Sequence, residues 1–320
     1  MQILKVNNTF GAVYELNLSD MKCLKSLASF LILSAFNVSS MFCQQQPAPI
    51  RFGIIADVQY GDCDTHGQRY YRNSLNKLAD CIADFNNQKV QFAVALGDFI
   101  DRSQTDLEPI TKKLQDLNGK FYNTAGNHDY KEITDNKVLF DRLGMPAEYY
   151  SFKKGKWRFV MLNTNEVASY SNIRGTWKEK EYEKMLERIK SSNRDNAQDW
   201  NGGISSKQLM WLDTELKDAQ NAGERVLIFS HNPIFPATNH AALNDKEILD
   251  VIGKYACVKC IISGHYHVGA FAYYNDIPCI TTEGMIETEN ENAYGIIELS
   301  DSELILTGYG RTKPYKLPLK

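Results

Sequence analysis

Polar side chains that can bind metal ions follow several apolar stretches of the chain. Five such clusters occur: ADVQ (56–59), LGDFID (96–101), AGNHDY (125–130), FSHNP (229–233) and SGHYH (263–267). They contain carboxylate, amide and imidazole groups: Asp57, Gln59, Asp98, Asp101, Asn127, His128, Asp129, His231, His265 and His267. A single histidine after a strand is more often structural, but four of the six histidines fall in these clusters. The recurrence predicts a centre for divalent cations, in which one carboxylate could bridge two ions about 3.5–4 Å apart.

The apolar runs that precede these clusters predict buried strands, and helical patterns lie between them. Strands are predicted over residues 50–56, 90–96, 120–124, 157–163, 225–230 and 258–263. Hairpins are predicted over 149–163, around KKGK, and over 295–307, around SDSE. Alternating strands and helices are typical of an α/β fold. Ligands bind at the carboxyl ends of strands in such folds, so the clusters could converge on one crevice.

Helix signals support this pattern. One apolar stripe at helical spacing consists of Leu75, Leu78, Ala79, Ile82 and Phe85. Ser205 and Gln208 match a capping box, and Gly223 stands where a left-handed residue would end that helix. Asn244 and Glu247 predict a second cap of the same kind.

Composition restricts the classes of function. The chain has 320 residues, 43% hydrophobic and 23% charged, with a formal net charge of −3. These values are ordinary for a globular protein and give no electrostatic reason to expect a nucleic-acid partner. We expect a single domain over residues 47–320, with the polar stretch 178–203 as a surface excursion.

The first 46 residues differ from the rest. Two lysines and a short apolar run, LASFLILSAFNV at 27–38, precede small residues, which is the layout of a secretory signal peptide. The run is too short for a stable membrane span, so we expect a secreted or periplasmic protein. A buried N-terminal helix is the alternative, and Met21 could be the true start. Cys43 could carry a lipid anchor, although the bulky Phe42 before it disfavours that processing.

The cysteines do not predict a disulfide framework. Five would remain after removal of a signal peptide, an odd number. Cys257 and Cys260 form a CVKC motif, but it runs into the strand predicted from residue 258, and in a strand residues three apart point to opposite faces. We therefore expect structural cysteines there.

Taken together, the motifs D-x-[H/Q], G-D-x-x-D, G-N-H-[D/E], a strand-end histidine and G-H-x-H resemble those of the calcineurin-like metallophosphoesterases over residues 50–310. The stretches DVQYGD, RYYRNSL, NGGISSKQLMWL and GMIETENENAYG are similar to the manganese-dependent ADP-ribose/CDP-alcohol diphosphatases. Those enzymes share the glutamine two residues after the first aspartate. The resemblance implies an α/β sandwich of two mixed β-sheets flanked by helices, with a dimetal site at the carboxyl ends of the strands.

The resemblance also implies a role for each clustered residue. Two divalent cations would be bound, manganese by resemblance, although iron and zinc suit the same ligands. The ligands would be Asp57, Gln59 and His267 for the first ion, Asn127, His231 and His265 for the second, and Asp98 as a bridge. His128 would contact the substrate, and Asp101 would hold the other nitrogen of His128. An N-cap of the following helix is the alternative for Asp101.

Such a centre would hydrolyse a phosphoester or phosphoanhydride, by in-line attack of a hydroxide that bridges the two ions. Arg72 and Asn73 are predicted to bind the substrate, and Arg102 is a further candidate for a second phosphate. Tyr60 and Tyr70 could stack on a base, whereas Tyr71 is assigned to the core. His240 precedes a predicted helix and could line the pocket.

Three functional hypotheses follow. The first is hydrolysis of the diphosphate in a nucleotide-linked small molecule such as ADP-ribose or a CDP-alcohol. The second is a broad phosphodiesterase, phosphatase or nucleotidase of the same superfamily. The third is a non-enzymatic metal-binding protein, which only the weaker ligand Gln59 supports. An amide oxygen does not compete with protons as imidazole does, so Gln59 predicts manganese rather than zinc. The oligomeric state is left open.

Overall fold

The computed structural model describes residues 3–7, 13–17 and 48–319, in two units that divide at Ala48 and Pro49. In the first unit, β1 (Ile3–Asn7) and β2 (Val13–Asn17) form an antiparallel pair. The rest of the expected signal peptide (1–46) lies outside the described residues. No helix among the described residues has the length and apolar character needed to cross a membrane.

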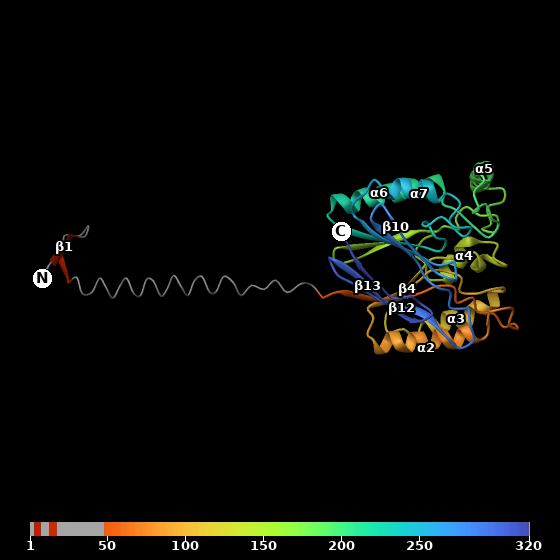
Figure 1. Cartoon of the computed structure of the whole chain (residues 1–320), viewed down its shortest axis with the longest axis horizontal. Helices are drawn as coiled ribbons and strands as arrows, with labels where there is room; N and C mark the ends of the chain where they lie inside the picture. The colour runs from red at the N-terminus through yellow and green to blue at the C-terminus, as the bar shows by residue number, and fades with distance from the viewer. Residues whose placement is uncertain (1–2, 8–12, 18–47, 320) are drawn as a thin grey trace. The chain divides into compact units, whose positions relative to one another are not determined.

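The second unit contains two six-stranded mixed sheets with helices on their outer faces (Figure 1). One sheet has the order β14-β13-β12-β3-β4-β5 and the other the order β10-β11-β9-β8-β7-β6. The first sheet comprises β3 (Ile50–Ile55), β4 (Phe92–Ala95), β5 (Lys120–Asn123), β12 (Ala293–Leu299), β13 (Glu303–Gly310) and β14 (Tyr315–Pro318). The second comprises β6 (Tyr150–Lys154), β7 (Trp157–Met161), β8 (Arg225–Ser230), β9 (Val258–Ser263), β10 (Ala270–Tyr274) and β11 (Ile277–Thr281). This architecture confirms the expected sandwich.

The helices cover the sheets on both sides. In Figure 1, α2 (Asn73–Asn87) and α3 (Leu107–Leu114) lie on one side, and α6 (Ser206–Asn221) and α7 (Asp245–Ile252) on the other. The other helices in residues 48–319 are α4 (Asn136–Arg142), α5 (Trp177–Ser191) and the 3₁₀ turns η1 (Gln104–Asp106) and η2 (His128–Tyr130).

Aromatic side chains from both sheets fill the space between them. Phe52 of β3 stacks on Phe92 of β4, with ring centroids 5.0 Å apart. The ring of Phe159 on β7 packs against Phe92 at 5.4 Å, edge to face. The neighbouring residue, Val160, belongs instead to the core beneath α6 and α7. Because side chains alternate along a strand, each inner strand contributes to two cores, and this explains why these strands are apolar throughout.

Most predicted elements are present, with boundaries shifted by a few residues. The two predicted hairpins are confirmed as β6–β7 and β12–β13. Strand β14 and the β10–β11 hairpin were not predicted from the sequence. Asn275 and Asp276 at the turn of that hairpin have φ values of 46° and 68°. An Asn-Asp pair between β-prone runs is the signal that could have identified it.

The predicted helix caps are only partly correct. The Ser205 hydroxyl accepts a hydrogen bond from the backbone N–H of Gln208, and Gly223 has φ of 66°. The Gln208 side chain does not complete the capping box, because it binds Asn163 and Glu166 instead. The prediction for the second cap was wrong, since the side chain of Asn244 makes no cap hydrogen bond.

The stretch 178–203 is not merely a surface excursion. Most of it forms α5, and the loop that follows is partly buried, including Asn196 and Asn201. This loop returns to the carboxyl ends of β8 and β9, where it contributes to the site described next.

Candidate metal centre

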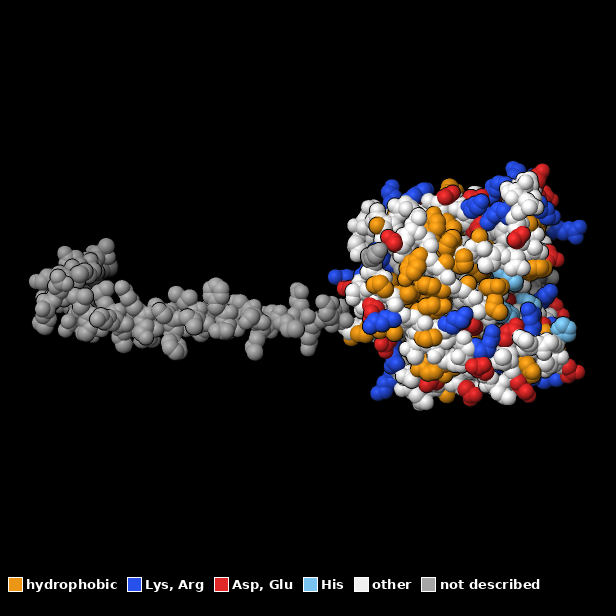
Figure 2. Space-filling model, in the orientation of Figure 1, with side chains coloured by type: hydrophobic (Ala, Val, Ile, Leu, Met, Phe, Trp, Pro, Cys, Tyr) orange, Lys and Arg blue, Asp and Glu red, His pale blue; other side chains and the backbone are white. Residues whose placement is uncertain are grey.

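The clustered polar residues meet where the carboxyl ends of the parallel strands of both sheets converge. A pocket of about 290 Å³ there is lined by Gln59, Arg69, Asp98, Asn127, His128, Trp200, His240, His265 and His267. Figure 2 shows histidine side chains at the surface near one edge of the domain. The sheets thus bring together residues that lie as far apart in the sequence as 57 and 267.

The backbone is strained at several of these residues. Asp57, Gln59, Asp98 and His265 have φ values of 54°, 43°, 56° and 65°. This left-handed region is costly for residues other than glycine, and such strain is often found at functional sites. Hydrogen bonds hold the conformation, among them those from Asp57 N–H to the Gly97 carbonyl and from Gln59 N–H to the Asp98 carbonyl.

His231 and three other side chains form a close group. Its Nε2 lies 3.1 Å from Asn127 Oδ1, 3.1 Å from His265 Nδ1 and 3.5 Å from Asp98 Oδ2. The ligand atoms of Asp98, His231 and His265 all lie within 4.8 Å of one another. One proton cannot satisfy so many converging lone pairs, whereas a cation would. This group corresponds to the predicted second ion with its bridging carboxylate.

The outer nitrogen of each imidazole in this group has an acceptor. His231 Nδ1 lies 2.7 Å from the Leu96 carbonyl oxygen, and His265 Nε2 lies 3.0 Å from Asn201 Oδ1. Because these oxygens only accept, the outer nitrogens carry the protons and the inner ones present lone pairs. Burial and the nearby His231 hold the pKa of His265 well below its usual value, which also favours the neutral ring.

Asn201 contacts the site through His265, although no role was predicted for it from the sequence. Its Nδ2 donates to the carbonyl oxygens of Asn196 and Asn239, so its Oδ1 must face His265. Its signal in the sequence was its place in the NGGISSKQLMWL stretch.

A second group consists of Asp57, Gln59 and His267. His267 Nε2 lies 3.4 Å from Asp57 Oδ1, and its Nδ1 lies 2.8 Å from Glu287 Oε1. Burial lowers the pKa of His267, but Asp57 and Glu287 outweigh this and raise it to about 9. Gln59 Nε2 donates to Asp98 Oδ2 at 3.1 Å, while its buried Oε1 has no hydrogen-bond partner among the described residues. A cation here would satisfy this orphaned oxygen.

Three buried carboxylates also indicate that the site binds cations. Asp57, Asp98 and Asp129 are each 1% exposed or less. Within residues 48–319, no lysine or arginine pairs with any of them. Asp129 accepts hydrogen bonds from the backbone N–H groups of Asp98, Phe99 and Gly126 and so fixes the loops, which is a structural role. Burial and the charge of Asp98 raise the pKa of Asp129 to about 7. The residues present therefore fit a pair of bound cations.

His128 projects into the pocket beside this centre. Its backbone N–H donates to Asp98 Oδ1 at 2.8 Å. Its Nδ1 lies 2.9 Å from the carbonyl oxygen of Asp101 and 3.3 Å from the carboxylate Oδ1 of that residue. Asp101 thus holds His128 with its backbone more closely than with its side chain. Asp101 is not the N-cap of the following helical turn, which was the alternative role for it, because Ser103 caps that turn.

The predicted substrate-binding residues Arg72 and Asn73 do not line this pocket. Arg72 forms ion pairs with two exposed carboxylates, Asp62 at 2.6 Å and Asp64 at 2.8 Å. It lines a neighbouring hollow instead of the metal pocket. Asn73 donates to the backbone of Glu289. The guanidinium that lines the pocket belongs to Arg69 instead.

The aromatic contribution to the pocket also differs from expectation. Tyr70 lines the neighbouring hollow and Tyr71 is buried in the core, as assigned. Trp200, with 39% of its surface exposed, and His240 line the metal pocket, with ring centroids 6.2 Å apart. Arg102 contacts Tyr71 and Asp101 rather than the pocket.

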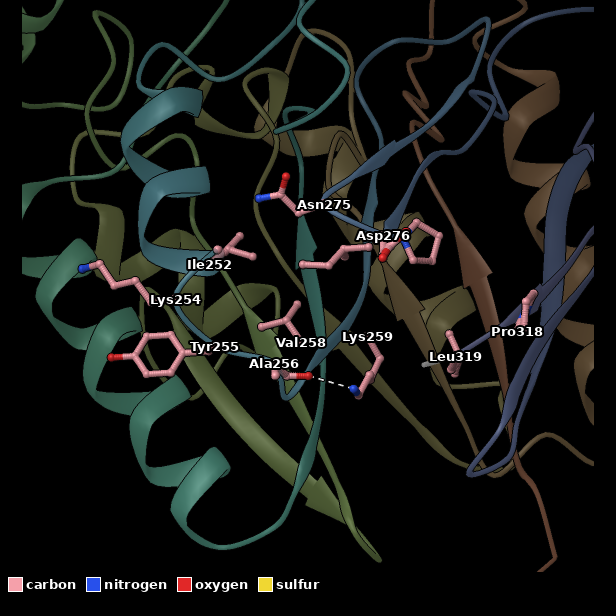
Figure 3. A pocket seen from close by; sticks show the side chains of 13 residues that line it. Ile252, Lys254, Tyr255, Ala256, Val258, Lys259, Asn275, Asp276, Pro318 and Leu319 are labelled. Atoms are coloured by element: carbon pink, nitrogen blue, oxygen red, sulfur yellow. Dashed lines mark hydrogen bonds between the residues drawn. The ribbon is translucent and has the colours of Figure 1, made fainter.

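A larger hollow of about 400 Å³ lies elsewhere, between the α7–β9 connection, the β10–β11 turn and the end of β14 (Figure 3). Its lining includes Ile252, Tyr255, Val258 and Leu319. None of the clustered polar residues contributes to it, so size alone does not locate the functional site.

Comparison with known proteins agrees with this geometry. A calcineurin-like phosphoesterase family model matches residues 50–269. A manganese-dependent ADP-ribose/CDP-alcohol diphosphatase of Danio rerio is 30% identical over 312 residues, which cover 82% of this chain and 96% of the relative. The human protein of that name is 29% identical over 310 residues, covering 81% and 90%.

A solved structure supports the same assignment. The crystal structure of a dimetal phosphatase from Danio rerio superposes with a TM-score of 0.77 at 27% sequence identity, covering 85% of this chain and all of that one. Its fold and the fit of the buried carboxylates, imidazoles and amides to two cations agree with the matched family. The chain therefore belongs to the calcineurin-like phosphoesterase family and is a metal-dependent phosphohydrolase with a centre for two divalent cations.

Proposed function

We propose that this enzyme hydrolyses the diphosphate linkage of nucleotide-linked small molecules such as ADP-ribose and CDP-alcohols, with two manganese ions. The observation that carries the proposal is that Arg69 and Trp200 line the same pocket as the candidate metal ligands. The names of relatives that match over most of their length suggest the same substrates and the same metal.

In this proposal the two groups described above hold one ion each. The ligands are Asp57, Gln59 and His267 for the first ion, Asn127, His231 and His265 for the second, and Asp98 for both. When bound, the ions would supply a hydroxide nucleophile and neutralise charge on the phosphoryl oxygens. Gln59 would contribute its orphaned oxygen, which favours manganese over zinc.

His128 is the residue placed to move a proton. Its Nδ1 faces Asp101, and no hydrogen bond engages its Nε2 in the described part of the chain. The ring lines the pocket, so with both ring nitrogens protonated Nε2 would donate to a phosphoryl oxygen or to the leaving group.

Arg69 and Trp200 would recognise the parts of the substrate beyond the reacting phosphate. The Arg69 guanidinium lies 3.9 Å from Asp101 Oδ1 and 3.9 Å from Glu287 Oε1, too far for a hydrogen bond to either. The guanidinium is therefore held by these two ion pairs but makes no hydrogen bond among the described residues, so its donors can bind the second phosphate. The exposed ring of Trp200 offers a surface on which a base could stack.

A substrate panel with manganese tests this proposal. Because hydrogen bonds to a charged group are worth about 1.5–3 kcal/mol, contacts to a second phosphate should raise kcat/KM by about 10- to 100-fold. We expect this advantage for ADP-ribose and CDP-choline over bis(p-nitrophenyl) phosphate and AMP. Faster turnover of either of the last two would instead support the broad phosphodiesterase or nucleotidase hypothesis.

The two arginines give a matched pair of variants. Arg69→Met should lower kcat/KM for ADP-ribose by about 10- to 100-fold, because it removes the donors to the second phosphate. Arg72→Met, which removes an exposed ion pair, should change kcat/KM by less than about twofold. Steady-state kinetics of both variants would measure this. The assignment fails if Arg72→Met shows the larger loss.

A further inference from the structure

The carboxylate of Glu287 lies between the first metal group and Arg69, the residue proposed above to bind the second phosphate. Its Oε1 is 2.8 Å from His267 Nδ1 and 3.9 Å from Arg69 Nε. The side chain is 15% exposed, so its charge is largely shielded from water. One carboxylate thus faces both a candidate ligand and a candidate substrate contact.

The segment that carries Glu287, residues 284–289, is joined to the loops on both sides of the pocket. Its backbone N–H groups at Met285 and Ile286 donate to the carbonyl oxygens of Ala56 and Asp57 at 3.0 and 2.9 Å. It also exchanges hydrogen bonds with the loop that carries Arg69, through Tyr70 N–H to Ile286 and Thr288 N–H to Gln68. A change in this segment would therefore reach both groups.

A buried lysine on α2 holds the backbone of the segment 284–289. Lys77 of α2 is 3% exposed, and its ammonium donates to the carbonyl oxygens of Met285, Glu287 and Thr288. No carboxylate takes part in these hydrogen bonds. An ammonium has three protons to donate, and here all of them go to one short segment. Such a site holds the backbone around Glu287 in a single conformation.

We propose that Glu287 is a positioning residue that links the first metal ion to the second phosphate of the substrate, with Lys77 as its support. It fixes the tautomer and orientation of His267 through Nδ1 and places Arg69 beside the pocket. The imidazoles of the second ion have other partners, the Leu96 carbonyl and Asn201. Removal of the Glu287 side chain should therefore weaken the binding of the first ion only. The part of the proposal that concerns Arg69 rests on the proposed function.

Manganese binding to the full-length protein tests the first part without any substrate. In calorimetric titration, Glu287→Ala should lower the affinity for one of the two ions by about 10- to 100-fold. The affinity for the other ion should stay within about twofold of the wild-type value. Glu287→Gln should fall between wild type and Glu287→Ala, since its amide oxygen still accepts from Nδ1. Glu289→Ala, which removes an exposed carboxylate of the same segment, should bind both ions as wild type does. The proposal would be overturned if Glu287→Ala lowered the affinity for both ions equally, or for neither.

Kinetics at saturating manganese test the second part. Glu287→Ala should raise KM for ADP-ribose by about tenfold while KM for bis(p-nitrophenyl) phosphate, which lacks a second phosphate, stays within about twofold. An equal rise for both substrates would refute the link to Arg69. A wild-type enzyme that does not prefer ADP-ribose would instead refute the proposed function, and the manganese titration would still decide the role of Glu287.

Lys77→Met should reproduce the selective loss of one ion in the same titration. If this variant does not fold, the three variants at positions 287 and 289 still decide the outcome, because neither of these side chains is fully buried. A folded Lys77→Met that binds both ions normally would remove Lys77 from the proposal.

Discussion

Asp98→Asn is expected to lower manganese-dependent kcat/KM by about 10³-fold or more while the fold is retained. The carboxylate of Asp98 is the one that both metal groups share, through Gln59 and His231. Holding two cations at the reaction centre is worth several kcal/mol, and each 1.4 kcal/mol corresponds to a factor of ten. Asparagine tolerates the left-handed φ of 56° at this position, so the loop can keep its conformation.

The thermal stability of the same variant separates loss of metal from loss of fold. In the presence of a chelator, Asp98→Asn should unfold about 2–4 °C above wild type, because it removes one of three buried carboxylates that no lysine or arginine neutralises. Manganese should raise the melting temperature of wild type more than that of the variant. Differential scanning calorimetry with and without the ion measures both effects. Full activity together with two bound ions in Asp98→Asn would exclude the bridging role.

His128→Ala is expected to lower kcat by about 10²- to 10⁴-fold with both metal ions still bound. The His128 side chain is 20% exposed and makes no hydrogen bond to a candidate ligand. Its backbone N–H donates to Asp98, and alanine retains that hydrogen bond. Elemental analysis of the purified variant checks that the ions are present. Unchanged manganese-dependent turnover would show that His128 has no catalytic role.

The leaving group identifies what His128 does. If its Nε2 protonates the leaving group, the loss in His128→Ala should be small for bis(p-nitrophenyl) phosphate, because p-nitrophenolate leaves without a proton. If Nε2 binds a phosphoryl oxygen instead, the loss should be similar for that substrate and for ADP-ribose. Comparing the two kcat ratios distinguishes these roles.

Much of the site could be predicted because its residue types follow from chemistry and its places follow from local pattern. Metal binding needs carboxylates, imidazoles and amides, and the apolar runs before Asp57, Asp98 and His231 identify strand ends. The strands β8 and β9 have the predicted boundaries for the same reason. The capping prediction at Gln208 failed because its side chain found partners on another segment, Asn163 and Glu166.

By itself, the sequence determined the class of chemistry and the elements that carry it, including the unusual Gln59 at the end of the first strand. Only the tertiary structure decided which nearby groups serve the site. Arg69 and Arg72 are the same residue type three positions apart, and the pairing of Arg72 with Asp62 and Asp64 leaves the pocket to Arg69. Glu287 orients His267 through a contact made by packing. Such contacts join segments distant in sequence, and local periodicity contains no information about them.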